Sequence, residues 1–225
     1  MLFILTFLLE FAVLFFLSRE LSRAISHLLL RITKKQTVTI YLLSILFMPG
    51  VIVHELSHML MAGMLMVPVG HMEFIPQIHG NSVKLGSVAI AKTDPLRRFL
   101  IGVAPILIGL TVIFSIYFFL FANTLVIFSW QTLLFLWVLF EVGNTMFSSR
   151  KDMEGAIGFL VIASLFIFAL FFFGVHVSSS VFAFLFSSKI LHVMEIMDVF
   201  LLILICIDSL IISLIKVNMR QTFLR

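Results

Sequence analysis

The chain contains few charged residues: Asp, Glu, Lys and Arg together make up 12% of its 225 residues. Soluble domains usually carry about 25% charged residues, so this composition argues against a soluble protein. A single cysteine, Cys206, excludes a disulfide within the chain and any metal site built from four cysteines. The net charge of +4 is small. We attribute it to anchoring beside anionic lipids and expect no nucleic-acid partner.

The sequence also lacks the features of a processed or divided chain. The N-terminal stretch MLFILTFLLE has no basic segment and no small-residue cleavage site, so it predicts a retained membrane span and not a signal peptide. No internal repeat and no long polar linker interrupts the chain. We therefore expect residues 1–225 to form a single membrane-embedded domain.

Hydrophobic residues, by contrast, make up 62% of the chain, and the mean hydropathy is +1.22. Several apolar runs reach the roughly 17–25 residues that a helix needs to cross a bilayer. The sequence therefore predicts an all-α polytopic membrane protein, with about six transmembrane helices in the lipid bilayer of the plasma membrane. The expected spans are residues 1–17, 38–67, 99–121, 125–147, 156–175 and 199–217.

Two segments depart from this simple pattern. Residues 18–36 are rich in Lys and Arg and have apolar residues at helical spacing, which predicts an amphipathic helix at the membrane surface. Residues 38–67 are too long for one straight span, and Pro49 and Gly50 lie near their middle. We expect these two residues to kink or break the helix.

Residues 71–90 lack a helical stripe. They contain residues typical of strands and a Gly-Asn turn signal at Gly80 and Asn81. The pattern predicts a small membrane-associated β-hairpin, which follows the segment that contains the most polar cluster of the chain.

That cluster is His54, Glu55 and His58, within the apolar stretch VIVHELSHMLMAG. In a helix, residues four apart lie on one face, so the two histidines can offer nitrogens to one metal ion. Two imidazoles and a carboxylate, with a fourth position for water, suit Zn²⁺. Glu55 lies next to His54, where it can act as general base toward a metal-bound water. The competing interpretation is a polar helix face that packs against loops.

A zinc site needs a third protein ligand, and the residue types alone leave several acids and histidines open. The candidates are Glu10, His71, Glu73, His79, Glu141, Asp152, Glu154 and Asp208. Glu141 is also a candidate partner for a zinc-bound histidine.

The segment NTMFSSRKDMEGA, residues 144–156, narrows this choice. Together with the His-Glu-x-x-His motif it resembles the site-2 protease family of intramembrane zinc metalloproteases, in which Asn-x-x-Pro-x-x-x-x-Asp-Gly follows the zinc helix. By position, the resemblance implies that Asp152 is the third zinc ligand and that Asn144 contacts the substrate backbone. Phe147 and Met153 stand where the family has Pro and Gly.

The resemblance covers about residues 49–156, which would form the protease-like core. It includes the predicted hairpin and the stretch FLIGVAPILIGL, residues 99–110, which resembles the small-residue-rich span that follows. It implies an intramembrane endopeptidase that cleaves membrane-embedded or membrane-proximal peptide segments, with Zn²⁺ as cofactor and a transmembrane peptide as substrate.

Three alternatives remain open from the sequence. The first is a zinc hydrolase that acts on a lipid or a lipidated substrate. The second is a non-catalytic homologue that binds and regulates membrane helices, although such a binder has no need of Glu55. The third is a transporter that uses Glu10 and Asp208, which leaves the spacing of the His54 cluster without an explanation.

Overall fold

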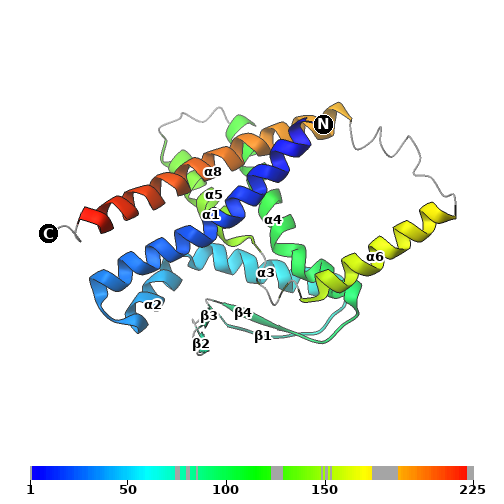
Figure 1. The fold of residues 1–225 in the computed structure, drawn as a ribbon, viewed down its shortest axis with the longest axis horizontal. Coiled ribbons are helices and arrows are strands. Elements are labelled where there is room, and N and C mark those ends of the chain that lie inside the picture. The colour runs from blue at the N-terminus through cyan, green and yellow to red at the C-terminus, as the bar shows by residue number, and fades with distance from the viewer. Residues whose placement is uncertain are drawn as a thin grey trace.

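The computed structural model describes residues 2–73, 77–79, 82–84, 86–122, 129–147, 149, 152, 154–173 and 187–221. The helices are α1 (Leu2–Thr33), α2 (Gln36–Leu46), α3 (Met48–Met64), α4 (Pro95–Ala122), α5 (Trp130–Thr145), α6 (Glu154–Phe172) and α8 (Ser188–Gln221). The strands are β1 (Val69–Glu73), β2 (Gln77–His79), β3 (Ser82–Lys84) and β4 (Ser87–Ile90) (Figure 1).

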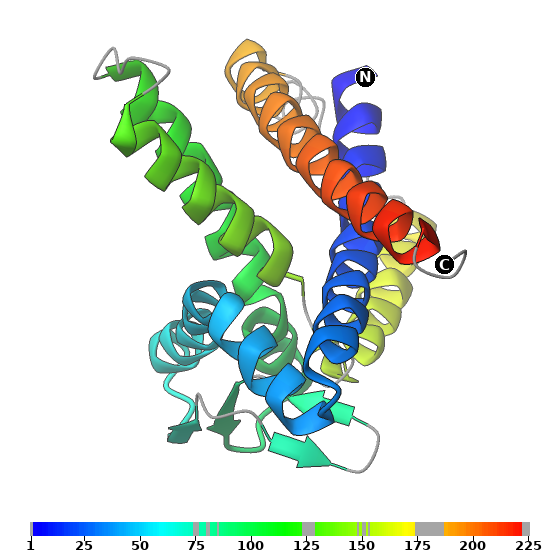
Figure 2. The ribbon, with the colours of Figure 1, turned by 90° about the vertical axis from the view of Figure 1, so that its left-hand side faces the viewer.

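The largest packed core lies where α1, α4, α5 and α8 meet. Its fully buried side chains include Leu14, Ile113, Leu139, Leu201 and Leu204. α1 and α8 lie side by side in both views, while α4 and α5 form a second pair that diverges from them (Figures 1 and 2). α3 and the strands lie together at one end of these two pairs.

Most of the predicted amphipathic helix over residues 18–36 forms the second half of α1, which ends at Thr33; Gln36 already begins α2. It is continuous with the first apolar segment because Leu21 and Ala24 bury against Ile212 and Ile215 of α8. Packing against another helix stabilises helical structure more than local propensity does. Arg19 and Arg23 therefore lie on a stretch of helix that is anchored against α8.

The predicted break near Pro49 is confirmed. α2 and α3 meet at Phe47 at an angle of 69°. Pro49 is the second residue of α3, where the missing N–H removes no helical hydrogen bond because the first turn has no intrahelical acceptor. The bend lets α3 begin in a new direction six residues before His54, alongside α4 and α5.

The predicted hairpin is also confirmed, in two nested parts. β1 pairs with β4 and β2 pairs with β3, both antiparallel. An irregularity between Val69 and Met72 shifts the register of the outer pair. The Gly80-Asn81 turn lies outside the described residues. β4 packs against α3, so the outer pair covers the helix that contains the His54 cluster.

The prediction of about six transmembrane helices is wrong. Within the described residues, two helices are long and apolar enough to cross a membrane, Pro95–Phe119 and Ser188–Arg220. The bent pair α2 and α3 adds a third if it forms one broken span. By length and composition, the described helices thus suit a membrane protein.

The other apolar runs fall short for physical reasons. α5 has 16 residues, which corresponds to about 24 Å against a hydrocarbon core of about 30 Å. α1 carries Glu10 in its apolar half and Arg19, Glu20 and Arg23 beyond it. Apolar composition alone therefore overestimates the number of spans.

Candidate metal centre

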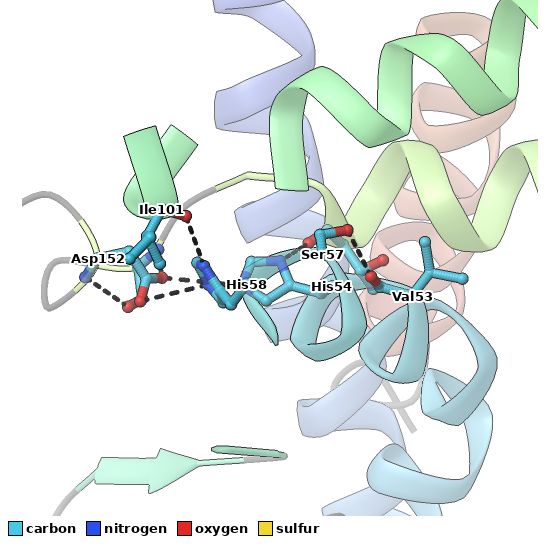
Figure 3. A network of polar contacts seen from close by, with 8 residues as sticks. Val53, His54, Ser57, His58, Ile101 and Asp152 are labelled. Atoms are coloured by element: carbon cyan, nitrogen blue, oxygen red, sulfur yellow. Dashed lines mark hydrogen bonds and ion pairs between the residues drawn. The ribbon is translucent and has the colours of Figure 1, made fainter. Parts of the chain in front are cut away.

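His54 and His58 project from one face of α3, one helical turn apart, as their spacing predicts. Their Nε2 atoms lie 3.2 Å apart, and their rings are nearly perpendicular, at 82° (Figure 3). Both side chains are largely shielded from solvent, with 13% and 5% of their surfaces exposed. The two nitrogens therefore face a common point inside the protein.

The opposite nitrogen of each ring is fixed by a backbone carbonyl. His54 Nδ1 donates to the carbonyl oxygen of Thr145 at 2.7 Å, and His58 Nδ1 donates to that of Ile101 at 2.8 Å. A carbonyl can only accept, so both Nδ1 atoms carry protons. In the neutral rings each Nε2 then carries a lone pair. Two lone pairs 3.2 Å apart repel each other, and a shared cation relieves that repulsion.

Both carbonyls are available because neither is used fully by its own helix. Thr145 is the last residue of α5, where carbonyls have no intrahelical donor. Ile101 lies inside α4, but the residue four positions on is Pro105. Proline has no N–H, so the carbonyl of Ile101 loses its helical partner and can accept from His58. The proline inside α4 thus has a direct consequence for the orientation of His58.

Asp152 approaches the two histidines from the connection between α5 and α6. Its Oδ2 lies 3.7 Å from His54 Nε2, and its Oδ1 lies 3.5 Å from His58 Nε2. The turn is closed by Ser149, whose N–H donates to Asp152 Oδ2 at 2.7 Å and whose Oγ accepts from the Asp152 N–H at 3.3 Å. Gly102 lets this turn approach α4, because a Cβ there would collide with the carbonyl oxygen of Asp152.

The charge state of Asp152 suits a metal ligand. Burial raises the pKa of its carboxyl, but His54 and His58, when their rings are protonated, and the N–H of Ser149 lower that pKa by more. The net pKa lies well below the ordinary value for aspartate. Asp152 is therefore a carboxylate at neutral pH, and no proton has to be displaced before it binds a cation.

The three side chains fit a tetrahedral metal ion. Among the described residues, His54, His58 and Asp152 form the one group of His, Cys, Asp or Glu whose ligand atoms converge, all within 4.8 Å of one another. With bonds of about 2.0–2.1 Å, two ligands of a tetrahedral ion lie roughly 3.3–3.4 Å apart. The separations of 3.2, 3.5 and 3.7 Å are close to this value. The prediction of Asp152 as the residue that joins the histidines agrees with this geometry.

Glu55 and the three ligand candidates line one cavity of about 550 Å³. Glu55 itself is 8% exposed. The segment that enters β4 lies against it, since a Cβ on Gly86 would be 3.2 Å from Glu55 Cγ and 2.6 Å from Val51 Cγ1. Residues of β4 form another wall of the same cavity. The Glu55 carboxylate thus borders the same cavity as the three ligand candidates and β4.

Asn144 lines this cavity too, and hydrogen bonds to residues that do not line the cavity fix its side-chain amide. Nδ2 donates to the carbonyl of Phe140 and to Asp208 Oδ1, both at 3.1 Å. An amide nitrogen has two protons, so both are used. Oδ1 has no hydrogen-bond partner among the described residues. Asn144 therefore has no amide proton left to donate to the cavity, and its oxygen is itself buried.

The other candidates for the third ligand lie elsewhere or outside the description. Glu141 is buried, but its Oε2 accepts from the Gly50 N–H at 3.4 Å. Glu141 is therefore not seen as the partner of either histidine, whose Nδ1 atoms donate to the carbonyls of Thr145 and Ile101. Asp208 is bound to Asn144. The side chains of His79 and Glu154 are not described; Glu10, His71 and Glu73 are not in the convergent group.

Sequence reasoning missed the backbone carbonyls that orient the histidines. Thr145 has no side-chain signal for this role, because any residue at the end of α5 offers the same carbonyl. For Ile101 there is a signal, namely Pro105 four residues later within an apolar helix.

Neither a protein-family model, nor a curated protein, nor a solved structure matches this chain.

The first prediction concerns the ligand set. The purified protein should contain about one metal ion per chain, measured by inductively coupled plasma mass spectrometry. His58→Ala and Asp152→Ala should each lose most of it, because each removes one of three convergent ligands. His192→Ala and Asp94→Ala, at exposed sites outside the cluster, are the controls and should retain it. Full metal content in a His54→Ala/His58→Ala double variant would refute the site.

The second prediction concerns Pro105. Pro105→Ala supplies an N–H that competes with His58 for the Ile101 carbonyl, so the ring of His58 loses its fixed orientation. Loss of such an orienting partner typically weakens metal affinity about 10–100-fold. A competition titration with a chromophoric chelator measures the change. Pro95→Ala, at the first residue of α4, is the matched control. Equal affinity in both variants would show that the freed carbonyl has no role.

Proposed function

We propose that this chain is an intramembrane zinc-dependent endopeptidase, as the resemblance to the site-2 protease family implies. The observation that carries the proposal is the convergence of His54, His58 and Asp152 beside Glu55 in one cavity. The donor set of two imidazoles and one carboxylate with room for water is the one that catalytic zinc uses in several hydrolases. A zinc ion held there would supply a water of lowered pKa and polarise a carbonyl.

Glu55 then has the role of general base. It is adjacent to His54 on α3, about a hundred degrees round the helix, and it lines the cavity into which the ligands point. Its carboxylate takes a proton from the attacking water and later passes that proton to the leaving amine. Burial at 8% exposure limits competition from bulk water for this proton.

The substrate in this proposal is a peptide in extended form. A peptide bond inside a helix is shielded by its own hydrogen bonds, so a membrane helix has to unwind before it is cut. β4 is paired on one side by β1 and borders the cavity with Val88, Ala89 and Ile90. A substrate strand can add to such an edge through main-chain hydrogen bonds. Asn144, which lines the same cavity, would contact the substrate backbone on the other side.

We further propose that the protein is a multi-pass protein of the plasma membrane and that its substrates are membrane-embedded or membrane-proximal segments of other proteins. Two helices, or three with the bent pair, are suited to cross the bilayer. His54, Glu55 and His58 lie on the second half of that bent pair. Ionisable residues at membrane depth are rare unless they serve a function and are shielded by protein.

The third prediction separates catalysis from metal binding. Glu55→Gln keeps the size of the side chain but removes its basicity, so zinc should remain bound while cleavage falls by about 10²–10⁴-fold. The measurement pairs metal content with the rate of cleavage of transmembrane-helix peptides in proteoliposomes. Glu195→Gln, at an exposed position on α8, is the control and should cleave at the rate of the unmodified protein.

The outcomes of this experiment distinguish the alternatives. Cleavage by Glu55→Gln at the unmodified rate would show that Glu55 is not the base. If neither protein cleaves any helix but both hold zinc and bind one, a regulatory helix-binding protein replaces the protease. If lipid or prenylated peptide is hydrolysed in a parallel incubation while helices stay intact, the site belongs to a lipid-directed zinc hydrolase.

A further inference from the structure

A second cavity, of about 340 Å³, lies between α1 and α8, away from the three metal-ligand candidates. Its apolar lining comes from Ala24, Ile215 and Met219, above the buried cluster that joins the two helices. Its polar lining is mostly basic, with Arg23, Lys216 and Arg220 against the single acid Glu20. We call this cavity the α1–α8 groove.

The basic charge of the groove exceeds what its own acid neutralises. Glu20 is paired on both oxygens, with Lys216 Nζ at 2.8 Å and Arg23 Nη1 at 3.6 Å. Arg220 adds a further cation in the last turn of α8. Arg31 Nη1 donates to the Met219 carbonyl at 3.5 Å and so ties the two helix ends together. The groove therefore has a net positive charge at a fixed position.

The relative direction of α1 and α8 brings their basic residues close together. α1 and α8 run parallel, since Thr6 contacts Asp198 and Glu20 contacts Lys216. Their basic halves therefore lie at the same end of the molecule. Ser188–Arg220 has 33 residues and is suited to cross a membrane. At about 50 Å it exceeds a hydrocarbon core of about 30 Å, so an end of this helix reaches the headgroup layer.

We propose that the α1–α8 groove binds one anionic phospholipid. Its phosphate lies against Arg23 and Arg220, and part of an acyl chain lies on Ala24, Ile215 and Met219. Guanidinium groups bind phosphate oxygens through paired N–H donors, which suits them to this role. The combination of an apolar floor with excess cations complements a lipid that is apolar at one end and negative at the other. A soluble phosphate would leave the floor without a partner.

Arg23 links the α1–α8 groove to the surroundings of the candidate metal centre. Arg23 also borders a third cavity, of about 310 Å³, together with Ser149 and Asn144. A headgroup held by Arg23 would thus lie beside the polar side of the metal-binding cavity. The lipid proposal itself does not depend on catalysis, and its test uses no activity measurement.

The test is native mass spectrometry of the full chain in detergent, titrated with phosphatidylglycerol and with phosphatidylcholine of the same acyl chains. One phosphatidylglycerol should remain bound per chain under conditions that remove phosphatidylcholine. Arg23→Gln/Arg220→Gln leaves the ion pair between Lys216 and Glu20 intact. Each removed cation should lower the affinity about fivefold, and the double variant about 25-fold. Lys92→Gln/Arg97→Gln removes the same charge outside the groove and should bind as the unmodified chain does.

Each other outcome overturns the proposal. Equal loss in the control variant would mean that overall charge, and not the groove, attracts lipid. Equal retention of phosphatidylcholine would remove the charge argument. Displacement of phosphatidylglycerol by millimolar inorganic phosphate, with one phosphate retained, would make the groove a site for free phosphate. Metal content of the double variant, expected to be unchanged, shows that the chain is folded.

Discussion

The candidate site depends on two hydrogen bonds from histidine to backbone. The Nδ1 atoms of His54 and His58 donate to carbonyls of Thr145 and Ile101, and this determines where both Nε2 atoms point. Without these bonds the rings could rotate, and the spacing of four residues on α3 would not be enough to make a ligand pair. The same bonds connect α3 to α5 and to α4. The same two hydrogen bonds therefore orient the ligands and link three helices. A change that breaks either bond affects both the ligand geometry and the helix packing.

The site is built where regular helical structure ends or is interrupted. Thr145 closes α5, Pro105 interrupts hydrogen bonding in α4, and Asp152 lies in the short connection before α6. Groups without helical partners are costly in an apolar environment unless they find other partners. Here the carbonyls are satisfied by imidazoles, and the carboxylate faces the two Nε2 atoms. The polar requirements of the helix ends and of the ligands are thus met together.

Much of the site followed from the sequence, because its main elements are local. His54, Glu55 and His58 lie within five residues, and helical spacing alone predicts that the histidines share a face. Asp152 required a family resemblance, since nothing local favours it over the other candidate acids. The bond between Asn144 and Asp208 joins residues 64 positions apart, and no periodicity reports such a contact. The number of spans was overestimated because hydropathy measures composition, whereas crossing a bilayer also requires a sufficiently long helix.

The central claim is that His54, His58 and Asp152 bind one zinc ion and leave room for water. Zinc K-edge X-ray absorption on the purified chain tests it most directly. The account predicts four light-atom ligands at about 2.0–2.1 Å, with the outer-shell scattering of two imidazoles. A spectrum with sulfur ligation, or with no imidazole scattering, would contradict it.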